Sequence, residues 1–410
     1  MKKNLVIAAL LMCTTALFSQ RFEEPQLTGE NFVHPTVKVG GDFALQYQIL
    51  KHHADVPLIP LGTGFNLPTA NMNLDAFLAP GIKLNLVMYL SSRHHNDTWV
   101  KGGYILFDKL PFINSPGIDK AMDYLTLKVG DMELNYGDEH FRRSDNGHVT
   151  DNPFVGNYIM DAFTTAPALE LMFRNPQGLL AMAGVTSGIL KQDLTKFNAS
   201  DSTYTAYNTL DELAFYYKAG FDKQLTEDFR LRLMFSGYNN PENHSGSLYN
   251  GDRAGSRYYL VMKRITDNAS DVDITSGHTS GQFGPGSLSK TNSYMVNLFS
   301  KYKGFEFFGT VETMSGLTTS KKDTKFSQYA AEGLYRFGGK KQFYGGVRYD
   351  YVKDRENDMS VDRVQAAAGW FLIPSILLKA EYVNQNYKDF AVYGDDAGFN
   401  GVMLEAAVSF

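Results

Sequence analysis

The sequence predicts an all-β protein that crosses a membrane as a single antiparallel β-barrel of about 18 strands. Three observations support this fold class. Apolar and polar residues alternate with a period of two in segments of about ten residues, which is the length of a tilted membrane strand. The composition, with 24 Tyr, 29 Phe and 37 Gly against 14 Pro, is typical of many short strands joined by tight turns. Downstream of residue 20, no apolar run is long enough to cross a membrane as a helix.

The first residues have the layout of a secretory signal peptide. Two lysines precede an apolar run over 5–12, and small or polar residues follow this run. We therefore expect 1–19 to be a signal peptide and 20–410 to be a single barrel domain in the bacterial outer membrane. Cleavage at this point would remove Cys13, the one cysteine of the chain, so we expect no internal disulfide after export.

The last segment, 401–410, shows the alternation most clearly. Its apolar face consists of Val402, Leu404, Ala406, Val408 and Phe410, and its other face carries Glu405. In 229–236, 363–372 and 376–385 the charged residues likewise fall on one face only. A final strand that ends in phenylalanine resembles the signature of outer-membrane barrels, so we expect the barrel-assembly machinery to bind this strand through Phe410.

The other candidate strands follow from the same pattern. They cover 36–49, 69–79, 82–92, 98–108, 123–136, 166–174, 178–189, 210–221, 228–238, 255–265, 290–302, 304–314, 327–337, 341–352, 361–372 and 375–387. Tight turns are expected on the periplasmic side, since such barrels place their longer loops outside. The tight turns begin near Pro80, Asn175, Leu225, Lys303, Gly338 and Ile373. Successive connections should alternate between the periplasmic and the external side of the membrane, and this alternation fails once along the chain. A weak strand at 271–278 would restore it. The expected count is therefore about 18, or about 16 if two weaker N-terminal segments are loops.

A soluble β-sandwich would show the same alternation with its apolar face turned inward, so the pattern alone does not separate the two folds. One barrel is favoured because the chain has no linker or composition break that would divide it into sandwich domains of about 100 residues. Aromatic residues also gather at strand ends, with Phe343 and Tyr344 at one end of a segment and Tyr349 and Tyr351 at the other, as in interfacial girdles.

The connection 137–165 is the third external loop in this arrangement, and it is long and highly charged at its start. We expect its charged residues to line a pore constriction; they are Arg142, Arg143, Asp138, Glu139 and Asp145. The alternative is that this loop simply faces the external water, as most loops do. The stretch 152–163 favours the inward arrangement, because it is too apolar for a freely solvated loop.

Two strand motifs carry a resemblance to a known family. The segment WVKGGYILFDKL (99–110) followed by YLTLKVGDMELNYG (124–137) resembles a strand pair of the phosphate-selective porin family. The match covers 71–146, under a fifth of the chain. The motifs FRRSDNG and NPFVGNYIMDAFTT also resemble porin-like proteins of flavobacteria and their relatives. The family name implies anion transport through a barrel.

Charged side chains predicted to line the lumen carry both signs. The basic residues are Lys38, Lys83, Lys128, Lys218, Arg230, Arg232, Arg348, Arg363 and Lys379, and the acidic residues are Asp42, Asp75, Glu212, Glu306, Glu312, Glu332, Asp350, Glu381 and Glu405. Neither sign dominates, and no lysine ladder suited to phosphate is visible. We therefore do not assign the selectivity that the family name implies.

Other chemistries fit the sequence less well. The adjacent histidines at 52–53 and 94–95 would point to opposite faces of a strand, and the acidic loop clusters lack EF-hand spacing, so we expect no metal and no cofactor. No G-x-S-x-G motif is present, and we expect no enzymatic activity. A net charge of -5 without a basic stripe argues against a nucleic-acid partner.

We therefore expect a porin that allows passive diffusion of small hydrophilic solutes or ions, in contact with outer-membrane lipid. A barrel of about 16 to 18 strands leaves an aqueous passage, and 20–35 is too short to form a plug domain. The resemblance implies a homotrimer, for which the small residues of 365–370 offer an interface. The alternative function is a barrel that binds or anchors at the cell surface without significant conductance.

Overall fold

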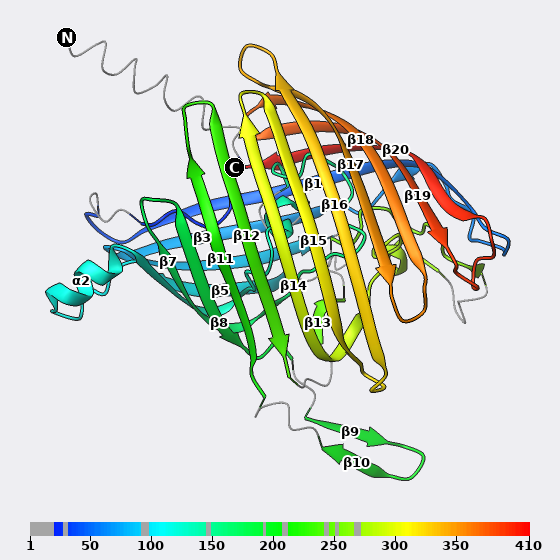
Figure 1. Cartoon of the computed structure of the whole chain (residues 1–410), viewed down its shortest axis with the longest axis horizontal. Helices are drawn as coiled ribbons and strands as arrows, with labels where there is room; N and C mark the ends of the chain where they lie inside the picture. The colour runs from blue at the N-terminus through cyan, green and yellow to red at the C-terminus, as the bar shows by residue number, and fades with distance from the viewer. Residues whose placement is uncertain are drawn as a thin grey trace.

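The computed structural model describes residues 20–27, 32–91, 98–144, 149–191, 194–206, 212–241, 246–250, 254–265 and 272–410. Sixteen long strands pair side by side in chain order, each antiparallel to its neighbours, and the last strand pairs with the first. The sheet is therefore a closed barrel (Figure 1). Closure leaves the ring without a free sheet edge. The predicted fold class is confirmed.

The ring strands are β1 (Thr36–His53), β3 (Thr69–Ala79), β4 (Ile82–Ser91), β5 (Thr98–Phe107), β6 (Leu125–Glu133), β7 (Thr165–Arg174), β8 (Leu179–Thr186), β11 (Ala214–Gln224), β12 (Phe229–Asn240), β14 (Gly286–Tyr302), β15 (Phe305–Thr318), β16 (Asp323–Phe337), β17 (Phe343–Asp354), β18 (Ser360–Ile373), β19 (Ile376–Lys388) and β20 (Ala397–Ser409). The short strands β2 (Gly64–Phe65) and β13 (Gly246–Tyr249) add pairings to β1 and β14. The strands β9 (Thr195–Asn198) and β10 (Thr203–Ala206) form a separate hairpin that lies apart from the ring (Figure 1). A short helix, α2 (Pro116–Met122), lies between β5 and β6.

The strand count equals the lower of the two numbers that the sequence suggested, but for a different reason. Every N-terminal segment predicted as a strand is a ring strand. The segment 255–265 is not, because Arg257, Leu260 and Met262 adopt positive φ angles of 75, 63 and 59°, which an extended strand excludes. The described part of 271–278 contains a 3-10 helix, Ile274–Gly277, in place of the weak strand.

The antiparallel order places the tight turns at the end of the barrel where β1 begins and β20 ends. These turns lie at 80–81, 175–178, 225–228, 303–304, 338–342 and 374–375, as predicted. The long connections 134–164 and 241–285 lie at the opposite end. The first of these is the third connection at that end, again as predicted. Within the described residues, no helix is long and apolar enough to cross a membrane.

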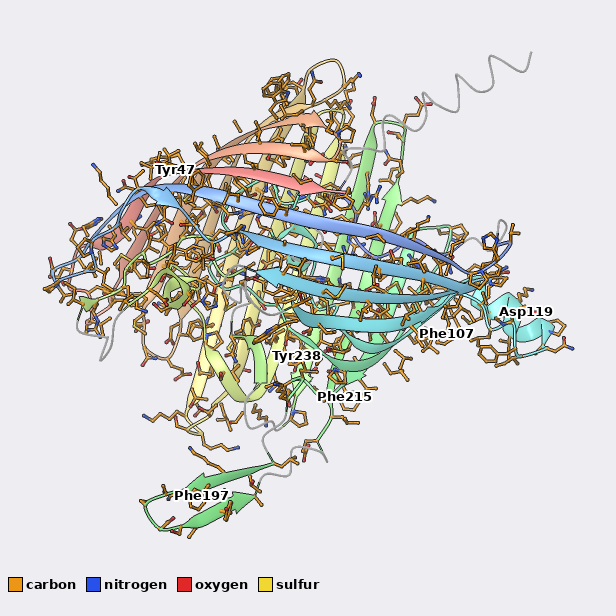
Figure 2. All side chains as sticks on the ribbon, turned by 180° about the vertical axis from the view of Figure 1, so that it is seen from behind. Tyr47, Phe107, Asp119, Phe197, Phe215 and Tyr238 are labelled. Carbon is orange, nitrogen blue, oxygen red and sulfur yellow. The ribbon has the colours of Figure 1, made fainter. Side chains whose placement is uncertain are left out.

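The two faces of the wall differ in chemistry. On β12, Leu233 is 49% exposed while Arg232 is fully buried, and on β20 Leu404 is exposed while Glu405 is buried. Figure 2 labels a further contrast, with Phe215 exposed on the outside of β11 and Tyr238 of β12 buried. Apolar side chains thus face outward and polar ones inward, which is the reverse of a soluble sandwich. The sandwich alternative is excluded.

An aromatic band follows the outer face near the tight turns. Phe305, Tyr335, Phe337, Phe343 and Trp370 succeed one another across β15 to β18, with ring centroids 4.5 to 6.2 Å apart. Such a band is typical of the interfacial girdle of a membrane barrel. One predicted girdle residue does not belong to it. Tyr344 is buried inside the barrel, because it follows Phe343 directly and so points to the opposite face.

Candidate pore constriction

The connection 134–164 between β6 and β7 lies against strands on the far side of the ring. Its backbone amides at Val155, Ile159 and Met160 donate hydrogen bonds of 2.7, 2.7 and 2.9 Å to Glu381 on β19, Asp350 on β17 and Gln328 on β16. We name this connection, in its described parts 134–144 and 149–164, the crossing segment. These bonds satisfy backbone groups of an irregular chain that would otherwise be buried without partners.

Arg142 of the crossing segment joins a buried cluster around Glu332. It lies in a 3-10 helix, Glu139–Arg142, which directs its guanidinium towards β16. Arg142 Nη2 lies 2.7 Å from Glu332 Oε2, and Arg348 Nη2 lies 2.6 Å from Glu332 Oε1. The hydroxyl of Tyr158 also donates to Glu332. One carboxylate therefore binds two guanidinium groups and ties the crossing segment to β16 and β17.

Arg143 has a partner in its own segment. Its Nη2 lies 2.6 Å from Asp161 Oδ2, and its guanidinium stacks over the ring of Phe163 at 4.4 Å. Because both partners belong to the same connection, this pair fixes the shape of the crossing segment. Arg142 and Arg143 are thus adjacent in sequence but have separate roles in the structure.

Asp138 binds the start of the crossing segment to β11 and β12 through two ion pairs. It lies 2.9 Å from Lys218 Nζ and 2.7 Å from Arg232 Nε. Burial of Asp138 opposes ionisation, but the charges of Arg232 and Lys218 outweigh it and hold the pKa of this carboxyl well below its usual value. The aspartate is therefore negatively charged at neutral pH.

Glu139 lies among acidic groups rather than beside a cation. Gln328 Nε2 donates to its carboxylate at 3.2 Å, and Glu312, Asp350 and Asp161 are the charges that act on it most strongly. Burial and these carboxylates raise the pKa of Glu139 well above its usual value. Asp145, the fifth residue predicted for the constriction, lies outside the described residues.

Most of the predicted lumen residues are buried on the inner face of the wall. Asp42, Lys83, Arg232, Arg348, Arg363, Lys379 and Glu405 are buried, and Arg230 is half-buried. Lys379 Nζ lies 2.6 Å from Glu405 Oε1, and it donates to the backbone carbonyls of Val149 and Phe154. Lys38 is exposed at the beginning of β1, with its ammonium over the ring of Phe77 at 5.0 Å.

A second connection that the sequence did not assign to the lumen also contacts these strands. The hydroxyl of Tyr258 donates to Glu381 Oε1 at 2.6 Å, and Arg257 Nη2 lies 3.5 Å from Glu405 Oε2. The apolar stretch around these residues predicts a strand, yet it packs as buried loop. A signal was available: 241–285 is the longest connection, and its apolar part needs a wall to pack against.

Residues 20–27 are the other group that the sequence did not place in the site. Glu23 and Glu24 pair with basic residues of the inner face, and Phe22 is buried. Their only local signal is two carboxylates beside a phenylalanine, just after the predicted cleavage point.

Comparison with solved structures places this barrel among known folds. An anion-selective porin from Comamonas acidovorans superposes with a TM-score of 0.53 at 11% identity, covering 92% of this chain and 100% of the other. OprB from Pseudomonas putida gives a TM-score of 0.53 at 8% identity, covering 92% and 94%. A loop-deleted form of OmpT, an outer-membrane protein of Vibrio cholerae, gives 0.51 at 10% identity, covering 92% and 99%. No model of a known family and no curated protein matches the sequence. At these identities the likeness concerns the fold alone: this chain shares the closed antiparallel β-barrel fold of these outer-membrane proteins.

Proposed function

We propose that the protein is a porin of the bacterial outer membrane through which small hydrophilic solutes or ions diffuse passively. The observation that carries this proposal is the combination, in one closed ring, of an apolar outer face with an inner face that holds charges of both signs. The outer face suits hydrocarbon, and the inner face suits water and polar solutes. Solutes would move down their own concentration gradient, without coupling to an energy source.

The proposed filter is the crossing segment, folded inward so that it narrows the lumen. Arg142 and Asp138 contribute its charges, Glu139 contributes a carboxyl group between them, and the inner faces of β11, β12, β16 and β17 contribute the groups opposite them. Basic and acidic side chains on different sides of a narrow passage create a transverse field, which filters solutes by charge as well as by size. The contacts of Arg142 with Glu332 and of Asp138 with Arg232 support this arrangement.

We further propose that residues 1–19 direct export and that the assembly machinery binds β20 through Phe410. Phe410 exchanges two backbone hydrogen bonds, of 3.0 and 3.1 Å, with Gly41 of β1, so it completes the closure of the ring. Phe410 as a residue is 74% exposed, so it is accessible for recognition. Removal of Phe410 should lower the amount of folded barrel in outer-membrane fractions, and an unchanged amount would argue against this role.

The outer wall also offers a site for a homotrimer. A groove of about 680 Å³ lies over β1 and β17 to β20, and its lining includes the small residues Ala368, Ala380 and Ala406 together with Phe343 and Trp370. Small residues allow close approach of a second wall. Light scattering in detergent should give three times the mass of one chain. The mass of a single chain would contradict the trimer.

The test of the channel is single-channel recording of the purified protein in planar bilayers. We expect discrete conductance steps, and we expect the double variant Arg142→Ala with Arg143→Ala to shift the reversal potential towards cations. Removal of two lumenal positive charges leaves the carboxylates in excess. The matched control is Lys340→Ala with Lys341→Ala, an adjacent basic pair exposed in a tight turn.

The control pair should leave the reversal potential unchanged. An unchanged reversal potential for the arginine variant would place the crossing segment outside the conducting path. A protein that inserts but gives no steps under any condition would instead support a surface-binding or anchoring barrel.

A further inference from the structure

Residues 20–27, with the sequence QRFEEPQL, precede the first strand and lie along the inner face of the barrel. We name them the strap. Its contacts reach seven ring strands, through the side chains of Lys83, Tyr104, Lys128, Arg174, Lys218, Arg230, Arg232 and Phe299, and they reach the crossing segment through Phe141 and Arg142. So short a segment with so many partners is held as a ligand would be, by convergent side chains from several elements.

The acidic residues of the strap pair with the basic side chains of the wall. Glu24 Oε2 lies 2.5 Å from Lys83 Nζ, and Glu23 Oε1 lies 2.6 Å from Arg232 Nη2 and 3.5 Å from Lys218 Nζ. Burial of Glu24 opposes ionisation, but Lys128 and Lys83 outweigh it and lower the pKa of this carboxyl to about 2. Arg232 and Lys218 likewise outweigh burial and lower the pKa of Glu23 to about 2, so both carboxylates are charged at neutral pH.

Phe22 anchors the strap next to the crossing segment. It is 6% exposed and makes edge-to-face contacts with Phe141 and Phe299, at centroid distances of 5.8 and 5.4 Å. The guanidinium of Arg232 lies 4.2 Å from its ring centroid. A buried aromatic ring with a stacked cation is the kind of anchor that dominates binding energy at protein interfaces.

Gln20 connects the strap to the proposed filter itself. Its side-chain oxygen accepts a 2.6 Å hydrogen bond from Arg142 Nη1, and its Nε2 donates to the carbonyl of Phe141. The same Arg142 binds Glu332. The strap and the charged residues of the proposed filter are thus in direct contact.

Side chains, and no sheet pairing, hold the strap in place. Among the described residues, none of the backbone-to-backbone hydrogen bonds joins 20–27 to the rest of the chain. Its backbone is bound by Arg230, Arg174 and the carboxylate of Asp108 instead. The strap can therefore leave without disturbing a strand of the ring, unlike a piece of the wall.

We propose that the lumen contains a binding site for a short acidic peptide and that the strap occupies it as a tethered ligand, restricting conductance while it is bound. This inference rests on the proposed channel. Departure of the strap would remove the carboxylates of Glu23 and Glu24 together with the exposed Arg21, a net loss of one negative side-chain charge. Among the described residues, it would leave Lys83 paired with Asp75, and Arg232 paired with Asp138 and Asp222. The open lumen is therefore wider and more positive than the closed one.

The test compares single-channel conductance and reversal potential in planar bilayers. For the chain that begins at Gln20, the double variant Glu23→Gln with Glu24→Gln should raise the mean conductance by about twofold or more and shift selectivity towards anions. The matched control is Glu227→Gln with Asp228→Asn, an adjacent acidic pair exposed in the tight turn between β11 and β12. This pair should change neither quantity.

A second experiment separates occupancy of the site from a loss of folding. A chain that lacks 20–27 should conduct as the Gln variant does, and the synthetic peptide QRFEEPQL, added at the tight-turn side, should return it to the lower conductance. The peptide QRFQQPQL should fail to do so. If the truncated chain conducts like the full chain, or if both peptides act alike, the proposal is wrong. A complete absence of steps in the full and truncated chains would overturn the proposed channel instead.

Discussion

Replacement of Glu332 by glutamine should release the crossing segment from the wall. Glu332 is buried and accepts hydrogen bonds from Arg142 of the segment and Arg348 of the wall, at 2.7 and 2.6 Å. Loss of one partner from a buried ion pair costs about 3 to 5 kcal/mol. We take about 3 kcal/mol, because both arginines keep other acceptors, namely Gln20 for Arg142 and the carbonyl of Gly156 for Arg348. That cost corresponds to an increase of about 100-fold in the population of the released segment.

Hydrogen exchange followed by mass spectrometry measures this release directly. Amides in 149–164 should exchange about 100-fold faster in Glu332→Gln than in the parent protein, while amides of the ring strands keep their rates, because the sheet pairing is untouched. Glu356→Gln is the control: Glu356 pairs with Lys325 in an exposed bridge, and exposed pairs contribute little to stability because water and salt screen them. Equal exchange in the parent and Glu332→Gln would refute the claim that this carboxylate holds the segment.

Two further predictions concern the same region. A Cβ atom on Gly156 would lie 2.0 Å from the hydroxyl oxygen of Tyr258. Gly156→Ala should therefore push the two buried connections apart and lower the midpoint of thermal unfolding. Gly333→Ala is the control and should leave this midpoint unchanged, because a Cβ atom there meets nothing within 4 Å. Because the pKa of Glu139 is raised above 4.5 in the folded protein, the folded state binds this proton more tightly, and the free energy of unfolding should fall as pH rises from 4.5 through the folded pKa. Urea titrations across this range should show a smaller fall for Glu139→Gln, and an identical pH dependence in both proteins would contradict the assignment.

The ring could be predicted from the sequence because its determinants are local. In β20, each residue reports its own side of the wall through its polarity, as Leu404 and Glu405 do, and the period of two needs no knowledge of distant partners. Turn residues at the strand ends then indicate at which end of the barrel each connection lies. The one long segment wrongly predicted as a strand is 255–265, whose polarity has another cause, and the strands missed within the sheet are the short β2 and β13.

The segment 255–265 shows what that other cause is. Tyr258 and Val261 are apolar because they pack inside the barrel as part of a connection, and period-two reasoning has no means to distinguish that burial from contact with lipid. The partners of the strap were beyond reach for a different reason. Glu24 meets Lys83 and Lys128 only because strands that are far from it in sequence converge on one place.

The structure also changes how the charges of the inner face should be counted. Several of them bind the backbone of the buried connections: Glu381 accepts from the amides of Val155 and Gly156, Lys379 donates to the carbonyl of Val149, and Arg363 donates to that of Asn157. Such charges satisfy irregular backbone that would otherwise be buried without partners, and they are already occupied before a solute arrives. A balance of signs summed over the whole inner face therefore does not determine selectivity. We expect selectivity to depend on the charged wall residues that contact the strap, together with Glu139. Substitutions of these residues should shift the reversal potential more than substitutions at Lys379 or Glu381.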